Sequence, residues 1–274
     1  MTKKAVILAR GLGTRMQKAQ DGVELDVERA ALARKGLKVL MSLHGRPMVD
    51  YAVDRLVRAG VDRICLVIAP EADQMRAHAD RLSRQAGIRV GWAVQDEPRG
   101  TADAVLAAEA FAGDDPFVVC NGDNLYPPDT MARLVALDGD ECCVAAFERE
   151  ALHRKGNIAP ERLRSMAVVQ ATPDGRLLRI VEKPPDPERY AVDGQVWANM
   201  NLYRFTPAVF DACRSIEPHP ERKEYELTAA VERLRAAAPQ AFRVLFSDGG
   251  VLDLTSRGDI AAVEHALAQE RLSF

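Results

Sequence analysis

The chain has 274 residues, of which 47% are hydrophobic, 28% charged and 5% aromatic, and its formal net charge is -3. This length can bury a large core and fits one sizeable α/β domain, and the composition excludes disordered, collagenous and membrane proteins. The lysines and arginines are scattered and the net charge does not attract polyanions, so we expect no nucleic acid as a partner.

The N-terminal segment and the cysteines both indicate a reducing, cytoplasmic compartment. The apolar run at residues 5–9 is far shorter than a secretory signal or a membrane span, so we expect no membrane contact. The five cysteines show no CxxC spacing and four of them lie in apolar runs. We therefore expect reduced core thiols instead of disulfides or zinc ligands.

The first half of the chain alternates strand-like and helix-like segments. β-rich apolar runs predict strands over residues 4–9, 62–69, 88–95 and 116–121. Segments with helical periodicity lie between them, at residues 47–59, 70–86 and 101–112. This alternation predicts a Rossmann-like α/β fold, in which helices cover both faces of a mostly parallel sheet.

From about residue 141 strand candidates follow one another, which predicts a smaller mixed or antiparallel extension. They cover residues 141–147, 165–171, 176–182 and 196–205, with a turn at Pro173-Asp174-Gly175. A helix, a strand and a helix are expected to complete the chain, at residues 224–238, 242–246 and 256–270. We treat residues 1–274 as a single domain with two parts, 1–140 and 141–274.

A glycine-rich loop directly follows the first predicted strand, where ligands bind in open parallel sheets. Residues 8–16 read LARGLGTRM. The glycines allow positive φ and close backbone approach, so loop amides can surround phosphate oxygens while Arg15 adds a charged fork. The loop is neither a GxGxxG fingerprint nor a P-loop, and taken alone such a loop is more often only a turn.

Two later segments also follow predicted strands and carry groups suited to a nucleotide. Residues 95–102 read QDEPRGTA; the Gln95 amide can pair with a base edge, and Gly100 lets a base ring lie on the backbone. Asp123 ends another buried strand and suits Mg²⁺, which prefers one or two carboxylates with phosphate oxygens and water. By itself each segment also fits an ordinary turn or helix cap.

Together these segments resemble the sugar nucleotidyltransferase family. The family's signature loop is Leu-Ala, a small residue, Gly, any residue, Gly-Thr-Arg-Met/Leu, and residues 8–16 match it except at Arg10. The long Arg10 side chain must point out of the loop or contact a phosphate itself. Lys38-Val39-Leu40 is similar to the family's Lys-x-Leu, with Leu37 in place of proline, and residues 95–102 resemble Gln-x-x-Pro-x-Gly-Thr-Ala.

The resemblance continues to the end of the chain. Gly122-Asp123 and the Asp253 segment VLDLT resemble the family's paired metal ligands, and Glu182-Lys183-Pro184 matches its Glu-Lys-Pro. The fit is looser where Asn201 replaces the usual glycine and Ala167 stands in the place of a glycine in Tyr-Gly-Val-Val. The family's Glu-Leu-Thr appears at residues 226–228.

The resemblance implies a role for each of these residues. Residues 1–140 would bind the nucleotide and residues 141–274 the sugar phosphate. Nucleotide binding is expected of Leu8, Ala9, Gly11, Gly13, Thr14, Arg15, Gln95, Gly100 and Thr101. Sugar-phosphate binding is expected of Glu182, Lys183, Asn199, Asn201 and Glu226. Mg²⁺ would be held by Asp123 and Asp253, and the catalytic set would be Arg15, Lys38, Asp123 and Lys183.

Charge accounting describes the same reaction. A sugar 1-phosphate attacks the α-phosphorus of a nucleoside triphosphate and releases pyrophosphate, so polyanions must be held together by cations. Arg15 and Lys38 would hold the triphosphate and Lys183 the sugar phosphate. The attacking phosphate is already an anion, so no side-chain nucleophile or base is needed, and catalysis is positioning and electrostatics.

Several alternatives stay open at this point. A dinucleotide oxidoreductase lacks support because the third glycine and the acidic ribose ligand are missing. A noncatalytic regulatory relative, or a cytidylyltransferase acting on another phosphorylated substrate, would fit the departures from the family pattern. Gln95 favours a pyrimidine such as uracil or thymine, although an amide can serve a purine equally well. The sugar, and whether copies of the chain form a homo-oligomer, are not determined.

The segment from Gln17 to Leu37 is longer than the corresponding segment usual in the family that the chain resembles, and we predict that it is a lid. Its core, residues 23–35, carries helix formers with acids early and bases late, and it ends before Gly36. Both ends adjoin expected phosphate contacts, Arg15 and Lys38. A hinge motion would therefore move both cations together and close the segment over the triphosphate.

Overall fold

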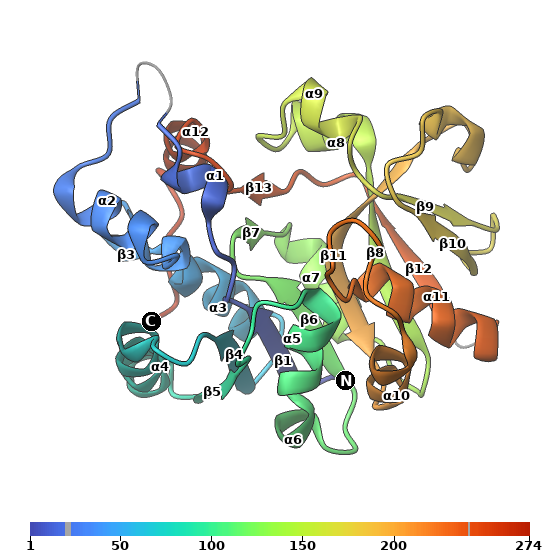
Figure 1. Cartoon of the computed structure of the whole chain (residues 1–274), viewed down its shortest axis with the longest axis horizontal. Helices are drawn as coiled ribbons and strands as arrows, with labels where there is room; N and C mark the ends of the chain where they lie inside the picture. The colour runs from blue at the N-terminus through green and yellow to red at the C-terminus, as the bar shows by residue number, and fades with distance from the viewer. Residues whose placement is uncertain (20–22, 241) are drawn as a thin grey trace.

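The computed structural model of the protein describes residues 1–19, 23–240 and 242–274. Its centre is a nine-stranded sheet in which seven strands follow the order β10-β9-β11-β6-β1-β4-β5, while β8 pairs with β11 and β12 (Figure 1). The strands are β1 (Lys4–Leu8), β4 (Arg63–Ile68), β5 (Arg89–Val94), β6 (Phe117–Asn121), β8 (Cys142–Glu148), β9 (Val168–Ala171), β10 (Leu177–Val181), β11 (Trp197–Phe205) and β12 (Phe242–Ser247).

The pairing confirms the predicted parallel centre and mixed extension. β1 pairs in parallel with β4 and β6, and β4 pairs in parallel with β5. β11 is antiparallel to β6, β8 and β9, and β9 is antiparallel to β10, whereas β12 is parallel to β8. One sheet therefore runs through both halves of the chain, with its direction changing at β11.

Both faces of the central strands are buried, which explains their continuous apolar sequences. Side chains alternate between faces along a strand, so Ile7 of β1 joins one core cluster and Val6 joins the other. Helices α3 (Met48–Arg58), α4 (Asp73–Ala86) and α7 (Pro128–Val135) cover the first face. Helices α5 (Thr101–Ala107), α10 (Ala208–Ser215) and α11 (Leu227–Ala237) cover the second.

Some helix predictions were wrong in extent. The helix expected over residues 101–112 is two, α5 and α6 (Glu109–Ala112), which meet at Ala108 with φ -92° and ψ 6°. The helix expected over 256–270 is only α12 (Asp259–Leu267), because the Asp259 carboxylate accepts from the backbone N–H groups of Thr255 and Ser256 and holds them in a turn. Helices α7 and α10 were not predicted.

The remaining elements are short and lie mainly in connections. They are α1 (Thr14–Gln17), α2 (Val27–Arg34), η1 (Lys38–Leu40), β2 (Ser42–Leu43), β3 (Arg46–Pro47), β7 (Asn124–Leu125), α8 (Arg149–Arg154), α9 (Pro160–Leu163), η2 (Pro187–Tyr190) and β13 (Leu252–Asp253). Among the described residues, no helix combines the length and apolar composition needed to cross a bilayer.

All five cysteines are buried free thiols, as the sequence predicts. Burial raises the pKa of Cys65, Cys120, Cys143 and Cys213 to about 12, and it also raises the pKa of Cys142. Because the thiolate is the reactive form, we expect almost no reaction of the native protein with DTNB at about pH 8. All five thiols should react after denaturation; rapid labelling of the folded protein would contradict this.

Candidate functional site

A cavity of about 440 Å³ opens at the carboxyl ends of the parallel strands. Leu8 ends β1, Asn121 ends β6 and Gln95 directly follows β5, and all three line the cavity. Among the residues predicted to act, the cavity is lined by Leu8, Ala9, Gly11, Gly13, Thr14, Lys38, Gln95, Gly100, Thr101 and Asp123. All of the nucleotide set except Arg15 therefore lies around one cavity, at the edge of the sheet where a parallel topology places a ligand.

The glycine-rich loop turns sharply from β1 into α1. Gly13 caps α1 in the left-handed conformation, with φ 61°, which favours glycine. Arg257 holds the end of α1 through hydrogen bonds to the carbonyl oxygens of Met16 and Gln17, each 3.1 Å long. Arg15 is exposed and has no ion pair among the described residues, so its guanidinium is free to meet an anion.

Lys38 and Asp123 form an ion pair inside the cavity. The Lys38 Nζ lies 2.5 Å from Asp123 Oδ2, and only 9% of the lysine side chain is exposed. η1 carries Lys38, and the turn between β6 and β7 carries Asp123. The ion pair neutralises two side chains for which the sequence predicts different roles: Lys38 is expected to bind phosphate and Asp123 to bind the metal.

Asp253 lies beside Asp123 because β13 pairs with β7. Asp253 is opposite Asn124 in this pairing, and the next residue, Leu254, donates its backbone N–H to Asp123 O at 2.9 Å. Asp253 Oδ2 lies 3.0 Å from both Asn124 Nδ2 and Arg162 Nη2. Its Oδ1 is buried and has no hydrogen-bond partner among the described residues.

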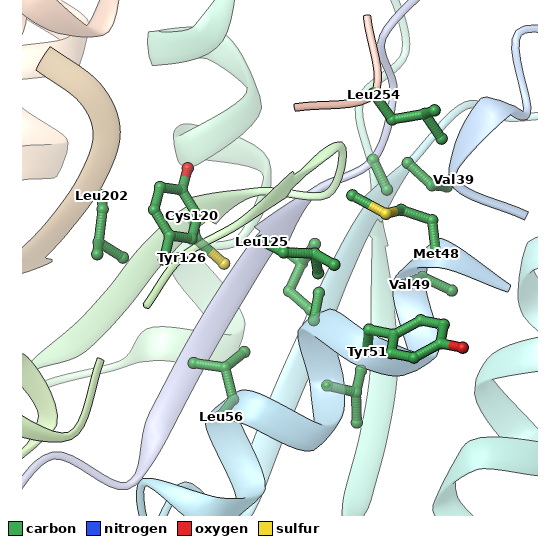
Figure 2. Close-up of a cluster of buried hydrophobic side chains, with 14 of the residues drawn as sticks. Val39, Met48, Val49, Tyr51, Leu56, Cys120, Leu125, Tyr126, Leu202 and Leu254 are labelled. Atoms are coloured by element: carbon green, nitrogen blue, oxygen red, sulfur yellow. The ribbon is translucent and has the colours of Figure 1, made fainter. Parts of the chain in front are cut away.

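The hydrophobic core fixes these charged residues from behind. Val39, Leu125 and Leu254 are sequence neighbours of Lys38, Asn124 and Asp253, and all three are buried in the same cluster. Figure 2 shows their side chains around Met48. Packing of the apolar neighbours therefore sets the backbone that carries the polar groups, as a functional site on rigid elements requires.

The backbone at Gly100 is approached closely by the protein itself, whereas a base ring lying on this glycine stays a prediction. Gly100 has φ 117°, and an added Cβ would lie 2.5 Å from Tyr225 O. The hydroxyl of Thr101 accepts from the backbone N–H of Leu227 at 2.9 Å, so it ties α5 to α11 and does not cap its own helix. The Gln95 segment and the Glu226 segment are thus one structural unit.

The sugar-phosphate set does not line this cavity. Glu182 Oε1 accepts from the Thr228 hydroxyl at 2.9 Å, and Glu226 pairs with Arg222. Lys183 is exposed, with φ 42° and no partner among the described residues. The structure thus joins Glu182 to the Glu-Leu-Thr segment and leaves the Lys183 ammonium free.

Asn201, which departs from the family pattern, fits its place in the structure. Asn201 has φ 56°, the left-handed region that glycine adopts freely and asparagine tolerates. Its backbone N–H donates to Asn199 Oδ1 at 3.0 Å, and the pairing of β11 shifts register between Asn199 and Tyr203. An asparagine can therefore replace glycine there without a change of backbone.

Two residues that contact the site were missed from the sequence. Arg162, in α9, reaches Asp253, and Asp103, in α5, accepts from Gln95 Nε2 at 2.8 Å. Arg162 lies in a connection with no family motif, so no local signal marks it. Asp103 lies one helical turn after Gly100. Its short separation in sequence from Gln95, across a strand-to-helix loop, could have indicated that the two side chains meet.

The predicted lid contains the predicted helix, and residues 20–22 of it lie outside the described residues. α2 begins after Asp26, whose side chain accepts from Arg29 N at 2.8 Å. Arg29 then reaches Glu264 of α12 at 2.5 Å and Ser42 O at 2.7 Å. Any motion of the lid must therefore either break the contacts of Arg29 or move together with the residues that Arg29 contacts.

We expect residues 27–37 to gain protection from hydrogen exchange when UTP and Mg²⁺ are added, because a closing lid removes amides from solvent. Peptide-level exchange with and without the ligands measures this. Helix α4, which does not line the cavity, serves as the internal control and should not change. Equal exchange in both states would leave α2 a static surface helix.

The sequence matches the family described as Nucleotidyl transferase over residues 4–269. A UTP–glucose-1-phosphate uridylyltransferase of Haloferax volcanii is 26% identical over 267 residues, 97% of each chain. A glucose-1-phosphate thymidylyltransferase of Streptomyces antibioticus is 28% identical over 234 residues, 84% of this chain but 57% of that one. A mannose-1-phosphate guanylyltransferase subunit of Xenopus tropicalis is 27% identical over 243 residues, 87% of this chain and 59% of that one.

Solved structures share the fold. A UDP-glucose pyrophosphorylase complexed with UDP-glucose superposes with a TM-score of 0.74, at 19% identity and over 99% of this chain and 100% of that one. An inositol-1-phosphate CTP transferase from T. maritima superposes with a TM-score of 0.72, at 17% identity and over 100% of this chain and 98% of that one. With the family match spanning nearly all of the sequence, the chain belongs to the nucleotidyl transferase family, among the sugar-1-phosphate nucleotidyltransferases.

Proposed function

We propose that the protein transfers a nucleoside monophosphate from a nucleoside triphosphate to a sugar 1-phosphate, giving a nucleotide sugar and pyrophosphate. The observation that carries this is the cavity itself, which joins the glycine-rich loop, the Lys38–Asp123 pair and the Gln95 loop at one edge of the sheet. A phosphate-binding loop, a cation and a base-binding loop around one space are what a nucleoside triphosphate requires.

The residues act by holding and neutralising phosphates. Backbone amides of the Gly11–Thr14 loop surround triphosphate oxygens, and the free guanidinium of Arg15 neutralises the departing pyrophosphate. Lys183, also unpaired among the described residues, holds the sugar phosphate against the repulsion of the triphosphate. In-line attack then needs only this alignment, because the nucleophile is already ionised.

Mg²⁺ is the metal that we propose, held by Asp123 and Asp253. The buried Oδ1 of Asp253 lacks a partner among the described residues and supports this choice, since a buried carboxylate oxygen demands a cation or a donor. When bound, the metal would neutralise charge on phosphate oxygens. Lys38 and Arg162 balance the two carboxylates within the protein.

The finer assignments follow the relatives. Their names specify UTP, thymidylyl and guanylyl transfer to glucose or mannose 1-phosphate, and we propose a hexose 1-phosphate as acceptor. We also propose a cytoplasmic location, which the five buried free thiols support.

A pyrophosphate-release assay tests the proposal. UTP, dTTP, GTP, CTP and ATP are each combined with a panel of hexose 1-phosphates and Mg²⁺. Release is expected only when both substrates are present. Nucleotide binding without release in any combination would support a noncatalytic relative and overturn the proposed activity.

A further inference from the structure

Arg10 crosses from the glycine-rich loop to the Gln95 loop and lines the cavity. Its Nη2 donates to the backbone oxygen of Asp96 at 2.7 Å, which anchors the guanidinium next to the expected base. Its Nε and Nη1 are enclosed and have no acceptor among the described residues. A buried donor without a partner is costly, so this side chain offers hydrogen bonds that the protein does not use itself.

Gln95 has the opposite character, because its donors are already used. Its Nε2 donates to Gly100 O at 3.0 Å and to Asp103 Oδ2 at 2.8 Å. Both partners are pure acceptors, so the amide nitrogen must face them and the side chain cannot turn over. Gln95 is 5% exposed and lines the cavity. Only its carbonyl oxygen is left for a ligand, and an oxygen can only accept.

The two acceptors that hold the Gln95 amide in this orientation are themselves held in place. Asp103 lies in the first turn of α5, where the helix dipole favours a carboxylate, and its Oδ1 accepts from Arg99 at 2.7 Å. Gly100 is held under the Tyr225 backbone, which donates to Arg99 O at 2.7 Å. Both acceptors that face Gln95 Nε2 are therefore fixed by further contacts.

We propose that Arg10 and Asp103 set the hydrogen-bond polarity of the base pocket and select a base that carries a ring N–H beside a carbonyl group. Uracil, thymine and guanine have this lactam edge. Arg10 would donate to the carbonyl oxygen, and the Gln95 carbonyl would accept from the ring N–H. Arg10 and Gln95 contact the base, whereas Asp103 is a positioning residue that acts through Gln95. This inference rests on the proposed function, because it assumes that the cavity holds a nucleotide.

The same polarity rejects cytosine and adenine. Cytosine presents a ring nitrogen lone pair to the Gln95 carbonyl and an amino group to Arg10, so both contacts become repulsive. Adenine likewise has an amino group and an unprotonated ring nitrogen in place of the lactam. An unpaired buried polar group lowers affinity by roughly one to two powers of ten, so we expect UTP to bind at least about tenfold more tightly than CTP.

Titration calorimetry with UTP and with CTP tests the proposal without turnover. Arg10→Ala should weaken UTP by roughly tenfold, and it should not weaken CTP, because the guanidinium repels the cytosine amino group. Asp103→Asn removes one of the two acceptors that hold Gln95 Nε2 and leaves only Gly100 O, so the amide turns over more readily; CTP should gain affinity while UTP stays within about threefold. Both variants should reduce the UTP preference. Arg10→Lys keeps the charge but loses the fork, and it should show the same loss of preference if Arg10→Ala does not fold.

Arg214→Ala is the control. Arg214, in α10, pairs with Glu109 and Asp211 and does not line the cavity, so its loss removes an arginine charge without touching the base pocket, and the UTP preference should persist. Equal losses of UTP and CTP affinity in Arg10→Ala would identify a phosphate contact and overturn the inference. An unchanged UTP preference in Asp103→Asn would overturn the positioning role of Asp103. Wild-type protein that binds both nucleotides equally overturns the inference alone, whereas protein that binds no triphosphate overturns the proposed function too.

Discussion

Asp123→Asn and Asp253→Asn are each expected to lower turnover by roughly two or more powers of ten. Each change removes a negative charge at nearly constant volume from one of two aspartates whose backbones the β7–β13 pairing brings close together. The amide binds a divalent cation weakly, and it also leaves Lys38 or Arg162 without its counter-charge. Steady-state rates over a Mg²⁺ series measure the effect, and circular dichroism and melting temperature report whether the fold is retained.

Asp248→Asn is the control for this pair. Asp248 lies in the segment that leads into β13, and its carboxylate pairs with Lys155 at 2.7 Å, but it is 77% exposed. An exposed ion pair contributes little, so turnover should be unchanged. Near-normal Mg²⁺-dependent rates in Asp123→Asn or Asp253→Asn would refute the assignment of the metal site.

The parallel centre of the sheet was predictable because its signals are local. β1, β4 and β6 are continuous apolar runs, buried on both faces, and a glycine-rich or polar loop follows β1 and β6. Ligand groups at the carboxyl ends of such strands meet by topology alone. The order of the motifs along the chain therefore predicts one common site for the nucleotide set, and all of its members except Arg15 line the cavity.

The β7–β13 pairing could not be predicted in the same way. Each strand has two residues, too few to show a period of two, and their partners are more than a hundred residues apart. The sequence suggested that Asp123 and Asp253 act together only through resemblance to a family. Their actual proximity depends on Leu125 and Leu254 packing in one core.

The contacts of long arginine side chains could not be predicted from the sequence either. Arg10, Arg29 and Arg162 each join segments that the sequence keeps apart. A guanidinium on a flexible stem reaches several ångströms in any direction, so the spacing of residues says little about its partner. At Arg10 the sequence identified an unusual residue, and only the structure supplied the contact to Asp96.

Lys183→Ala is expected to raise the KM for the sugar 1-phosphate by at least about tenfold while leaving the affinity for UTP unchanged, and Arg15→Ala is expected to weaken UTP binding instead. Both side chains are exposed and lack partners among the described residues, so neither change should disturb the fold. Titration with UTP alone isolates the nucleotide site, and initial rates at saturating UTP isolate the sugar-phosphate site.

Lys223→Ala matches Lys183→Ala closely, because Lys223 is also an exposed lysine in the left-handed region, with φ 58° against 42°. Loss of a charge and any change in backbone strain are thus the same in both variants, and only the position differs. The Lys223 variant should keep both substrate constants. If Lys183→Ala instead lost affinity for UTP and kept its KM for the sugar 1-phosphate, Lys183 would belong to the triphosphate site, and the assignment of the two substrates would be reversed.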